Sequence, residues 1–205
     1  GSYANNTNVR QHSDIDIAIV QEDIFIPKYR SYVSDENYGF QKAIPRSKSF
    51  KDLIEEILRK NFGEDVERKN KSIKINGNSY RKDADTVPAI RHKDYSNDYY
   101  NNPNNYIGGI LIYADDGEKI VNYPEQHIRN GIEKNKITNL YFKKMVRIAK
   151  ELRYQMCDLN YKNAKKTSSF GIECLLYNIP NEIFIKSNKY VYIFDEIVKY
   201  LYGYR

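Results

Sequence analysis

The sequence has little of several residue types. Among its 205 residues, two are cysteines, three are histidines and none is tryptophan. Cys157 and Cys174 lie within helical patterns and no signal peptide is apparent, so we expect no disulfide. The histidines at positions 12, 92 and 127 are scattered, so no Cys/His cluster has the spacing of a zinc site. No apolar run approaches the length of a membrane span, and we expect a cytoplasmic protein.

Charge and aromatic content are less restrictive. The formal net charge is +6, which permits binding of polyanionic nucleotides but does not require it. Tyrosine is abundant, with 20 residues. Because these tyrosines have no regular spacing, we expect most of them to pack or to lie on the surface. The segment 95–106, rich in Asn and Tyr, is expected to be a surface loop and is a weak candidate for substrate contact.

Two aspartates precede the first apolar run. Asp14 and Asp16 alternate with Ile15 and Ile17, so in a β-strand both carboxylates lie on one face while the isoleucines point into a core. Neighbouring carboxylates repel, and a divalent cation such as Mg²⁺ relieves that repulsion while holding phosphate oxygens. A solvated strand face is the alternative interpretation.

The chain begins with Gly1 and Ser2. Glycine lets the backbone approach a phosphate closely, and the serine hydroxyl can donate to anionic oxygens. A remnant of tag removal is the alternative origin of this pair. A Gly-Ser pair followed about a dozen residues later by Asp-x-Asp on a strand resembles the sequence signature of the nucleotidyltransferase superfamily that includes DNA polymerase β.

A two-metal site of this kind needs a third carboxylate. The pair Asn76-Gly77 is typical of a tight type I′ hairpin, which predicts strands at Ile73–Ile75 and from Tyr80 to Val87. Asp83 and Asp85 would share one face of the second strand. The residues alone do not choose between these two aspartates.

A resemblance to one family indicates which of the two aspartates is the third carboxylate. The run Asp85-Thr86-Val87-Pro88-Ala89 is similar to the Asp-Val-Val-Pro-Ala element of the cGAS/DncV-like nucleotidyltransferases (CD-NTases), whose third metal ligand is the aspartate, here Asp85. Further similar segments are Tyr123-Pro124, Lys134-Asn135, Thr138, residues 141–152 and residues 168–173. The resemblance also implies a helix-rich segment ahead of the Gly-Ser pair, where this sequence begins.

The resemblance implies three substrate contacts in the second half of the chain. Lys143 and Ser169 would contact the triphosphate, and Phe170 would stack on a nucleobase. Lys144 is a rival for Lys143, and a solvated helix face is the alternative for either lysine. Phe170 is equally reasonable as a core residue.

The order of patterns predicts an α+β fold. A capped helix from Phe50 to near Gly63 and several strands come first, and helical periodicity follows Pro124. We expect a nucleotidyltransferase core at residues 1–124 and a helical, oligoadenylate synthase-like domain at residues 125–205, with the active site in the cleft between them.

The expected activity follows from the resemblance. Asp14, Asp16 and Asp85 would hold two Mg²⁺ ions, with Mn²⁺ as a substitute, and Gly1, Ser2, Lys143 and Ser169 would position the phosphates. The expected protein is a monomer that joins nucleoside triphosphates into a cyclic or linear oligonucleotide second messenger for bacterial antiphage defence. Transfer to an RNA or protein acceptor and a non-catalytic nucleotide sensor are the alternatives, and neither RNA nor a protein regulator is indicated as a partner.

Overall fold

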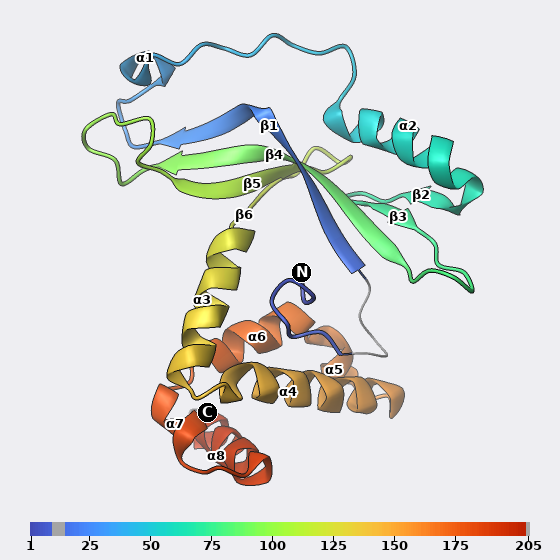
Figure 1. Ribbon diagram of the computed structural model, residues 1–205, viewed down its shortest axis with the longest axis vertical. Coiled ribbons are helices and arrows are strands. Elements are labelled where there is room, and N and C mark those ends of the chain that lie inside the picture. Colours follow the sequence, from blue (N-terminus) through green and yellow to red (C-terminus); the bar gives the residue numbers. More distant parts are fainter. Residues whose placement is uncertain (10–14, 204–205) are drawn as a thin grey trace. The chain divides into compact units, whose positions relative to one another are not determined.

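A computed structural model describes residues 1–9 and 15–203, so the predicted metal ligand Asp14 lies outside the described residues. The chain divides into two compact units (Figure 1). Of the described residues, the sheet unit comprises Gly1 and residues 15–126, and the helical unit comprises residues 2–9 and 127–203. No described helix is both long and apolar enough to cross a membrane.

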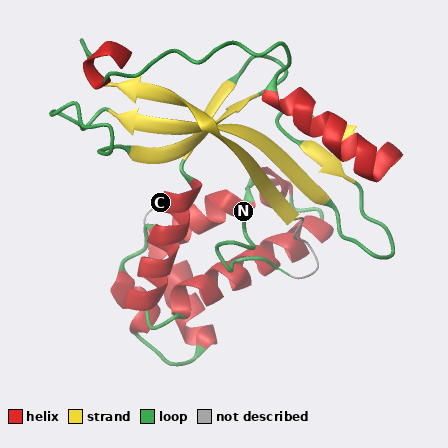
Figure 2. Cartoon of the chain, turned by 45° about the horizontal axis from the view of Figure 1, so that its top comes forward, coloured by secondary structure: helices red, strands yellow, loops and turns green. Residues whose placement is uncertain are grey.

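The sheet unit is built around one long central strand. Its elements are β1 (Ile15–Tyr29), α1 (Asp35–Tyr38), α2 (Phe50–Phe62), η1 (Gly63–Asp65), β2 (Val66–Arg68), β3 (Ile73–Ile75), β4 (Ala84–Tyr95), β5 (Ile107–Tyr113) and β6 (Lys119–Asn122). Strand β4 pairs with β1 in parallel, and antiparallel with β3 near its start and β5 further along (Figure 2). The sheet is therefore mixed, with the order β2-β3-β4-β5-β6 and β1 against β4.

Helix α2 packs on the sheet as its sequence predicts. The Ser49 side chain accepts a hydrogen bond from the backbone N–H of Asp52, and Gly63 ends the helix. One apolar stripe of α2, centred on Ile54, joins Val66 and Ile73 in a small core. These contacts cover one face of the sheet near β2 and β3.

The connection between β3 and β4 differs from the prediction. Strand β4 begins at Ala84 rather than Tyr80, and neither Asn76 nor Gly77 has the positive φ that a type I′ turn needs. The turn instead forms around Asn78, whose side-chain oxygen accepts from the backbone N–H groups of Tyr80 and Arg81. Asparagine competes effectively for such local bonds, so the chain turns two residues later than the Asn-Gly pair suggested.

Segment 95–106 is a structured loop organised by Asp98. This carboxylate accepts hydrogen bonds from the Tyr38 hydroxyl, the Asn105 side-chain amide and the backbone N–H groups of Tyr100 and Asn102. Asp98 is 1% exposed. The loop thus folds around a buried acid that accepts hydrogen bonds from three donors within the loop and from the distant Tyr38 hydroxyl.

The helical unit has its own apolar core. Its elements are α3 (Pro124–Ile137), which begins in the sheet unit, α4 (Tyr141–Asp158), α5 (Lys162–Lys166), α6 (Ser169–Tyr177), α7 (Asn181–Ile185) and α8 (Tyr190–Gly203). The buried residues of this core are Phe142, Met145, Val146, Ile172, Leu176, Ile179, Phe184, Ile193 and Ile197. They come from α4, α6, α7, α8 and the turn after α6, so the helices form one packed body.

Candidate active site

The sheet unit brings two of the predicted metal ligands together. Asp16 on β1 and Asp85 on β4 are direct partners in the parallel register. Neighbouring strands lie about 4.8 Å apart and partner side chains share a face, so the two carboxylates lie side by side. Asp85 accepts one hydrogen bond, from the Ser72 hydroxyl at 3.4 Å, and forms no ion pair with any described residue.

The rival aspartate is committed elsewhere. Asp83 precedes β4, and its carboxylate accepts from the backbone N–H of Gly77 at 2.6 Å and pairs with the Lys74 ammonium at 2.8 Å. The Lys74 hydrogen bond is the main cause that holds the pKa of Asp83 below its usual range. Asp83 therefore stabilises the β3–β4 connection, and its partners favour Asp85 as the metal-facing residue.

Gly1 lies against this acidic pair. Gly1 groups with the sheet unit, and a Cβ atom added to it would collide with the Asp16 side chain. Only glycine permits so close an approach of the backbone. The backbone of Gly1 therefore lies directly beside the Asp16 side chain.

The donor set suits a hard divalent cation. Two carboxylates on one face of two neighbouring strands supply the oxygen ligands that Mg²⁺ prefers. Within residues 1–9 and 15–203, no three His, Cys, Asp or Glu side chains converge into a complete metal cluster. The third predicted ligand, Asp14, falls outside those ranges.

The two candidate lysines are neighbours on helix α4 of the helical unit but lie in different environments. The Lys143 side chain is 8% exposed, and its ammonium makes no hydrogen bond or ion pair to the described part of the chain. Burial lowers the pKa of Lys143, and the nearby Glu173 only partly opposes that shift. Lys144 instead lies over the rings of Tyr141 and Tyr190. The buried, unpartnered charge of Lys143 favours it as an anion contact.

The start of α6 presents the other two predicted contacts. Ser168 is the N-cap, its hydroxyl accepting from the Gly171 N–H, while the Ser169 hydroxyl lies 3.2 Å from that of Tyr154. Phe170 is 60% exposed and meets the His127 ring edge-on, with centroids 5.2 Å apart. Phe170 is thus no core residue, and most of its surface is exposed.

Ser2 belongs to a turn carried by the helical unit. The Ser2 carbonyl accepts from the Thr7 N–H at 2.9 Å, and the Tyr3 carbonyl accepts from the Asn6 N–H. The Arg147 guanidinium on α4 donates to the Asn6 carbonyl at 2.7 Å. The predicted Gly-Ser pair is therefore divided, with Gly1 in one unit and Ser2 in the other.

Sequence reasoning missed a buried polar network in the helical unit. Glu173 on α6 pairs with Lys150 on α4 and accepts from Asn5 and Thr7. Burial raises the pKa of Glu173, but its hydrogen bonds, from Lys150 above all, outweigh burial and hold the pKa below its usual value. The available signal was a charged residue inside the apolar pattern of α6, between Ile172 and Leu176.

Comparisons with known proteins show the family of the chain. Residues 129–205 match the family model of the cGAS/DncV-like nucleotidyltransferase C-terminal helical domain. The chain is 41% identical over 204 residues to a cyclic dipurine nucleotide synthase of Elizabethkingia meningoseptica, covering 97% of this chain and 68% of that protein. The chain belongs to the CD-NTases. It is therefore a member of a nucleotidyltransferase family, as the sequence predicts.

The chain is also similar to another CD-NTase. A cyclic GMP-AMP synthase, CdnE03, of Staphylococcus schleiferi is 58% identical over 182 residues, which are 88% of this chain and 56% of that protein. The chain thus spans little more than half of that relative.

Solved CD-NTase structures show the same fold. The cyclic dinucleotide synthase CdnE of E. meningoseptica, with GTP and Apcpp, has a TM-score of 0.77 at 39% identity. The c-UMP-AMP synthase CdnE of Rhodothermus marinus, with Apcpp and Upnpp, has a TM-score of 0.86 at 28% identity. Each comparison covers 99% of this chain and 68% of the other. The α+β fold class predicted from the sequence is confirmed.

Proposed function

We propose that the whole protein joins nucleoside triphosphates into a cyclic dinucleotide messenger with release of pyrophosphate. The observation that carries this proposal is the register of Asp16 and Asp85 on adjacent parallel strands, with Gly1 against Asp16. We assign a purine product as well, following two of the relatives: CdnE03 is named a cyclic GMP-AMP synthase and the E. meningoseptica protein a cyclic dipurine synthase. Cyclic GMP-AMP is the first product to seek.

The residues divide the work of an in-line phosphoryl transfer. Asp14, Asp16 and Asp85 would hold Mg²⁺, which when bound neutralises phosphate charge and lowers the pKa of the attacking ribose hydroxyl. Gly1 and Ser2 place backbone and hydroxyl donors near the phosphates, and Lys143 and Ser169 add a charge and a donor. Phe170 offers an exposed aromatic side chain on which a base could stack. Positioning and charge neutralisation are most of what such a transfer requires.

The remaining assignments belong to the same proposal. We place the boundary between the nucleotidyltransferase core (1–124) and the helical domain (125–205) at Tyr123-Pro124. The protein acts as a cytoplasmic monomer on free nucleotides, with Mn²⁺ able to replace Mg²⁺. Its product serves antiphage defence.

A direct assay tests the proposal. The full-length protein is incubated with all four nucleoside triphosphates and Mg²⁺ or Mn²⁺, and products are identified by mass spectrometry. A cyclic purine dinucleotide is the expected product. Label that appears only on an added RNA or on the protein would support acceptor modification instead, and nucleotide binding without any product would support a sensor.

A further inference from the structure

One buried carboxylate has no part in the chemistry proposed above. Glu173 lies one helical turn after Ser169 on α6, and its side chain is 6% exposed. Its oxygens accept from the Asn5 side-chain amide at 2.9 Å, the Thr7 hydroxyl at 2.5 Å and the Lys150 ammonium. A buried acid with this many donors fixes the position of each of them.

One side of this network holds the N-terminal turn. Because the Thr7 N–H donates to the Ser2 carbonyl, fixing Thr7 also fixes the backbone of Ser2. Lys150 donates to the Thr7 carbonyl at 3.2 Å. Gly131 on α3 makes room for Asn5, since a Cβ there would collide with the Asn5 amide. The turn is thus held by α3, α4 and α6 together.

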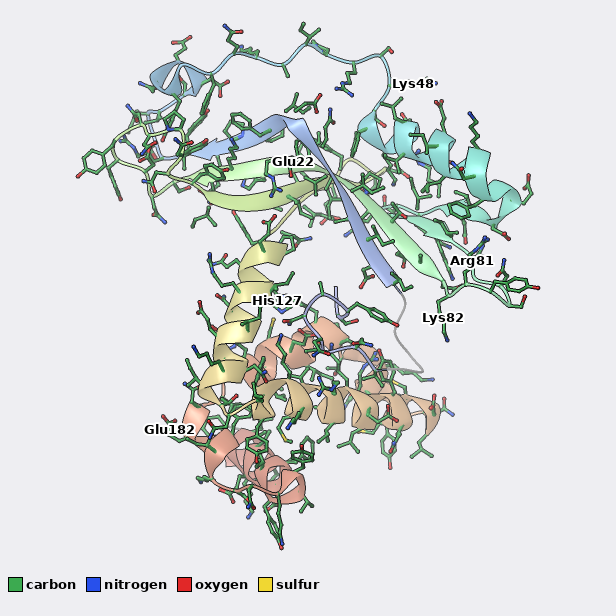
Figure 3. The ribbon with its side chains drawn as sticks, in the orientation of Figure 1. Glu22, Lys48, Arg81, Lys82, His127 and Glu182 are labelled. Carbon is green, nitrogen blue, oxygen red and sulfur yellow. The ribbon has the colours of Figure 1, made fainter. Side chains whose placement is uncertain are left out.

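The other side of the network reaches the exposed aromatic ring. The Nε2 atom of His127, on α3 (Figure 3), lies 3.3 Å from Glu173 Oε2. The His127 ring meets the Phe170 ring edge-on at 75°. No other described aromatic ring contacts Phe170, so His127 is its ring neighbour in the described chain.

We propose that Glu173 is a positioning residue for the nucleotide: it holds the turn that carries Ser2 and, through His127, the ring of Phe170 as one preassembled surface. This inference rests on the proposed function. Glu173 reaches both groups without touching substrate itself. The turn and the ring would then already be ordered in the free protein, so less conformational entropy is lost when the nucleotide binds and binding is stronger.

The geometry also indicates which substitution tests the proposal. Glu173→Gln keeps the size of the side chain and one acceptor oxygen. Its new –NH₂ group must face donors on one side of the network, so at least one of those contacts is lost. The chain offers a matched control in Asp98→Asn, the same change at a buried, four-fold hydrogen-bonded carboxylate in the sheet unit.

The measurements are made on the full-length protein. For Glu173→Gln we expect a non-hydrolysable triphosphate analogue to bind at least about tenfold more weakly, the size of one lost charge-assisted hydrogen bond. We also expect KM to rise more than kcat falls, and amide hydrogen exchange in residues 2–7 to speed up. Asp98→Asn should lower the melting temperature without these changes.

Each result then has a distinct meaning. A folded Glu173→Gln protein with unchanged analogue affinity overturns the positioning role, whereas a wild-type protein that binds and converts no triphosphate overturns the proposed function. If Glu173→Gln does not fold, Thr7→Val keeps the Lys150 pair and removes one donor. Weaker analogue binding by folded Thr7→Val supports the inference, and unchanged binding contradicts it.

Discussion

The two units hold their key carboxylates in opposite ways. In the sheet unit, Asp85 lies beside Asp16, with one hydroxyl donor and no cation among its described partners. In the helical unit, Glu173 is buried against Lys150 and further donors. An acid paired with another acid stores repulsion that a metal ion can relieve, while an acid with every lone pair satisfied fixes its neighbours. The arrangement in the sheet unit suits metal binding, and the arrangement in the helical unit suits holding neighbouring residues in place.

The largest expected effect comes from Asp85→Asn. Removing a metal ligand should lower kcat on the order of 10³-fold or more, since metal stabilisation of the transition state is worth several kcal/mol. The melting temperature should hold or rise slightly, because repulsion from Asp16 is relieved. Product yield and thermal unfolding measure both.

Asp83→Asn is the matched control for that substitution. Asp83 is tied to Gly77 and Lys74, so its loss should affect the β3–β4 connection and leave most activity in place. Full activity of Asp85→Asn together with an inactive, folded Asp83→Asn would show that Asp83, and not Asp85, is the metal ligand.

The second effect concerns Phe170 in the helical unit. If the exposed ring stacks on a base, Phe170→Ala should weaken nucleotide binding by about 1–3 kcal/mol. Since the side chain is 60% exposed, the loss of stability should stay well below the roughly 3–5 kcal/mol of a buried Phe→Ala change. Calorimetric binding and urea unfolding separate the two, and Phe170→Tyr should be nearly silent. Unchanged affinity in the Ala variant would rule out stacking.

The third prediction sets two neighbouring lysines of α4 against each other. Lys143→Met should weaken triphosphate binding about tenfold through loss of a charged contact. Its stability should not fall, because the burial that lowers the pKa of Lys143 also makes its charge costly. Lys144→Met should lose only the ring contacts to Tyr141 and Tyr190, about 0.5–1 kcal/mol of stability. Equal losses of affinity would show that neither lysine is specific.

Much of the fold could be predicted from local patterns. The Ser49 cap, the apolar stripe of α2 and the hairpin of β5 and β6 each depend on residues close in sequence. The face of α8 could not be predicted the same way. The helical spacing of Val191, Phe194, Val198 and Leu201 predicts that these residues share a buried face, yet Val191 and Val198 are exposed. Ile193 and Ile197 are buried instead. The apolar face of α8 is broad, so spacing alone does not decide which part of it is buried.

The candidate site shows the same limit. Asp16 and Asp85 could be proposed from motifs, but their pairing depends on the register of two strands far apart in the chain. Glu173 meets Asn5 and Thr7 across more than 160 residues of sequence, as separations of 168 and 166 show. No local pattern encodes such a contact, because tertiary packing creates it.

The smallest expected effect concerns Asp115, a carboxylate of the sheet unit that, unlike Asp85, is paired with cations. Asp115 pairs with Arg68 and Lys51, and the Arg68 hydrogen bond is the main cause that lowers its pKa to about 2. A carboxyl whose pKa is depressed on folding adds stability that is present above its ordinary pKa, about 3.9. That stability disappears as the pH falls toward 2. Because Asp115 is partly exposed, we expect at most about 1 kcal/mol.

The variant Asp115→Asn isolates that contribution. Its urea unfolding free energy should lie below that of the wild type at pH 7. The gap should narrow as the pH falls from about 5 toward about 2, because the Asp115 carboxyl protonates first in the unfolded state and only near pH 2 in the folded state. A pH-independent gap for Asp115→Asn would mean that its ion pairs contribute nothing, and the distinction between paired and unpaired acids would then rest on Glu173 alone.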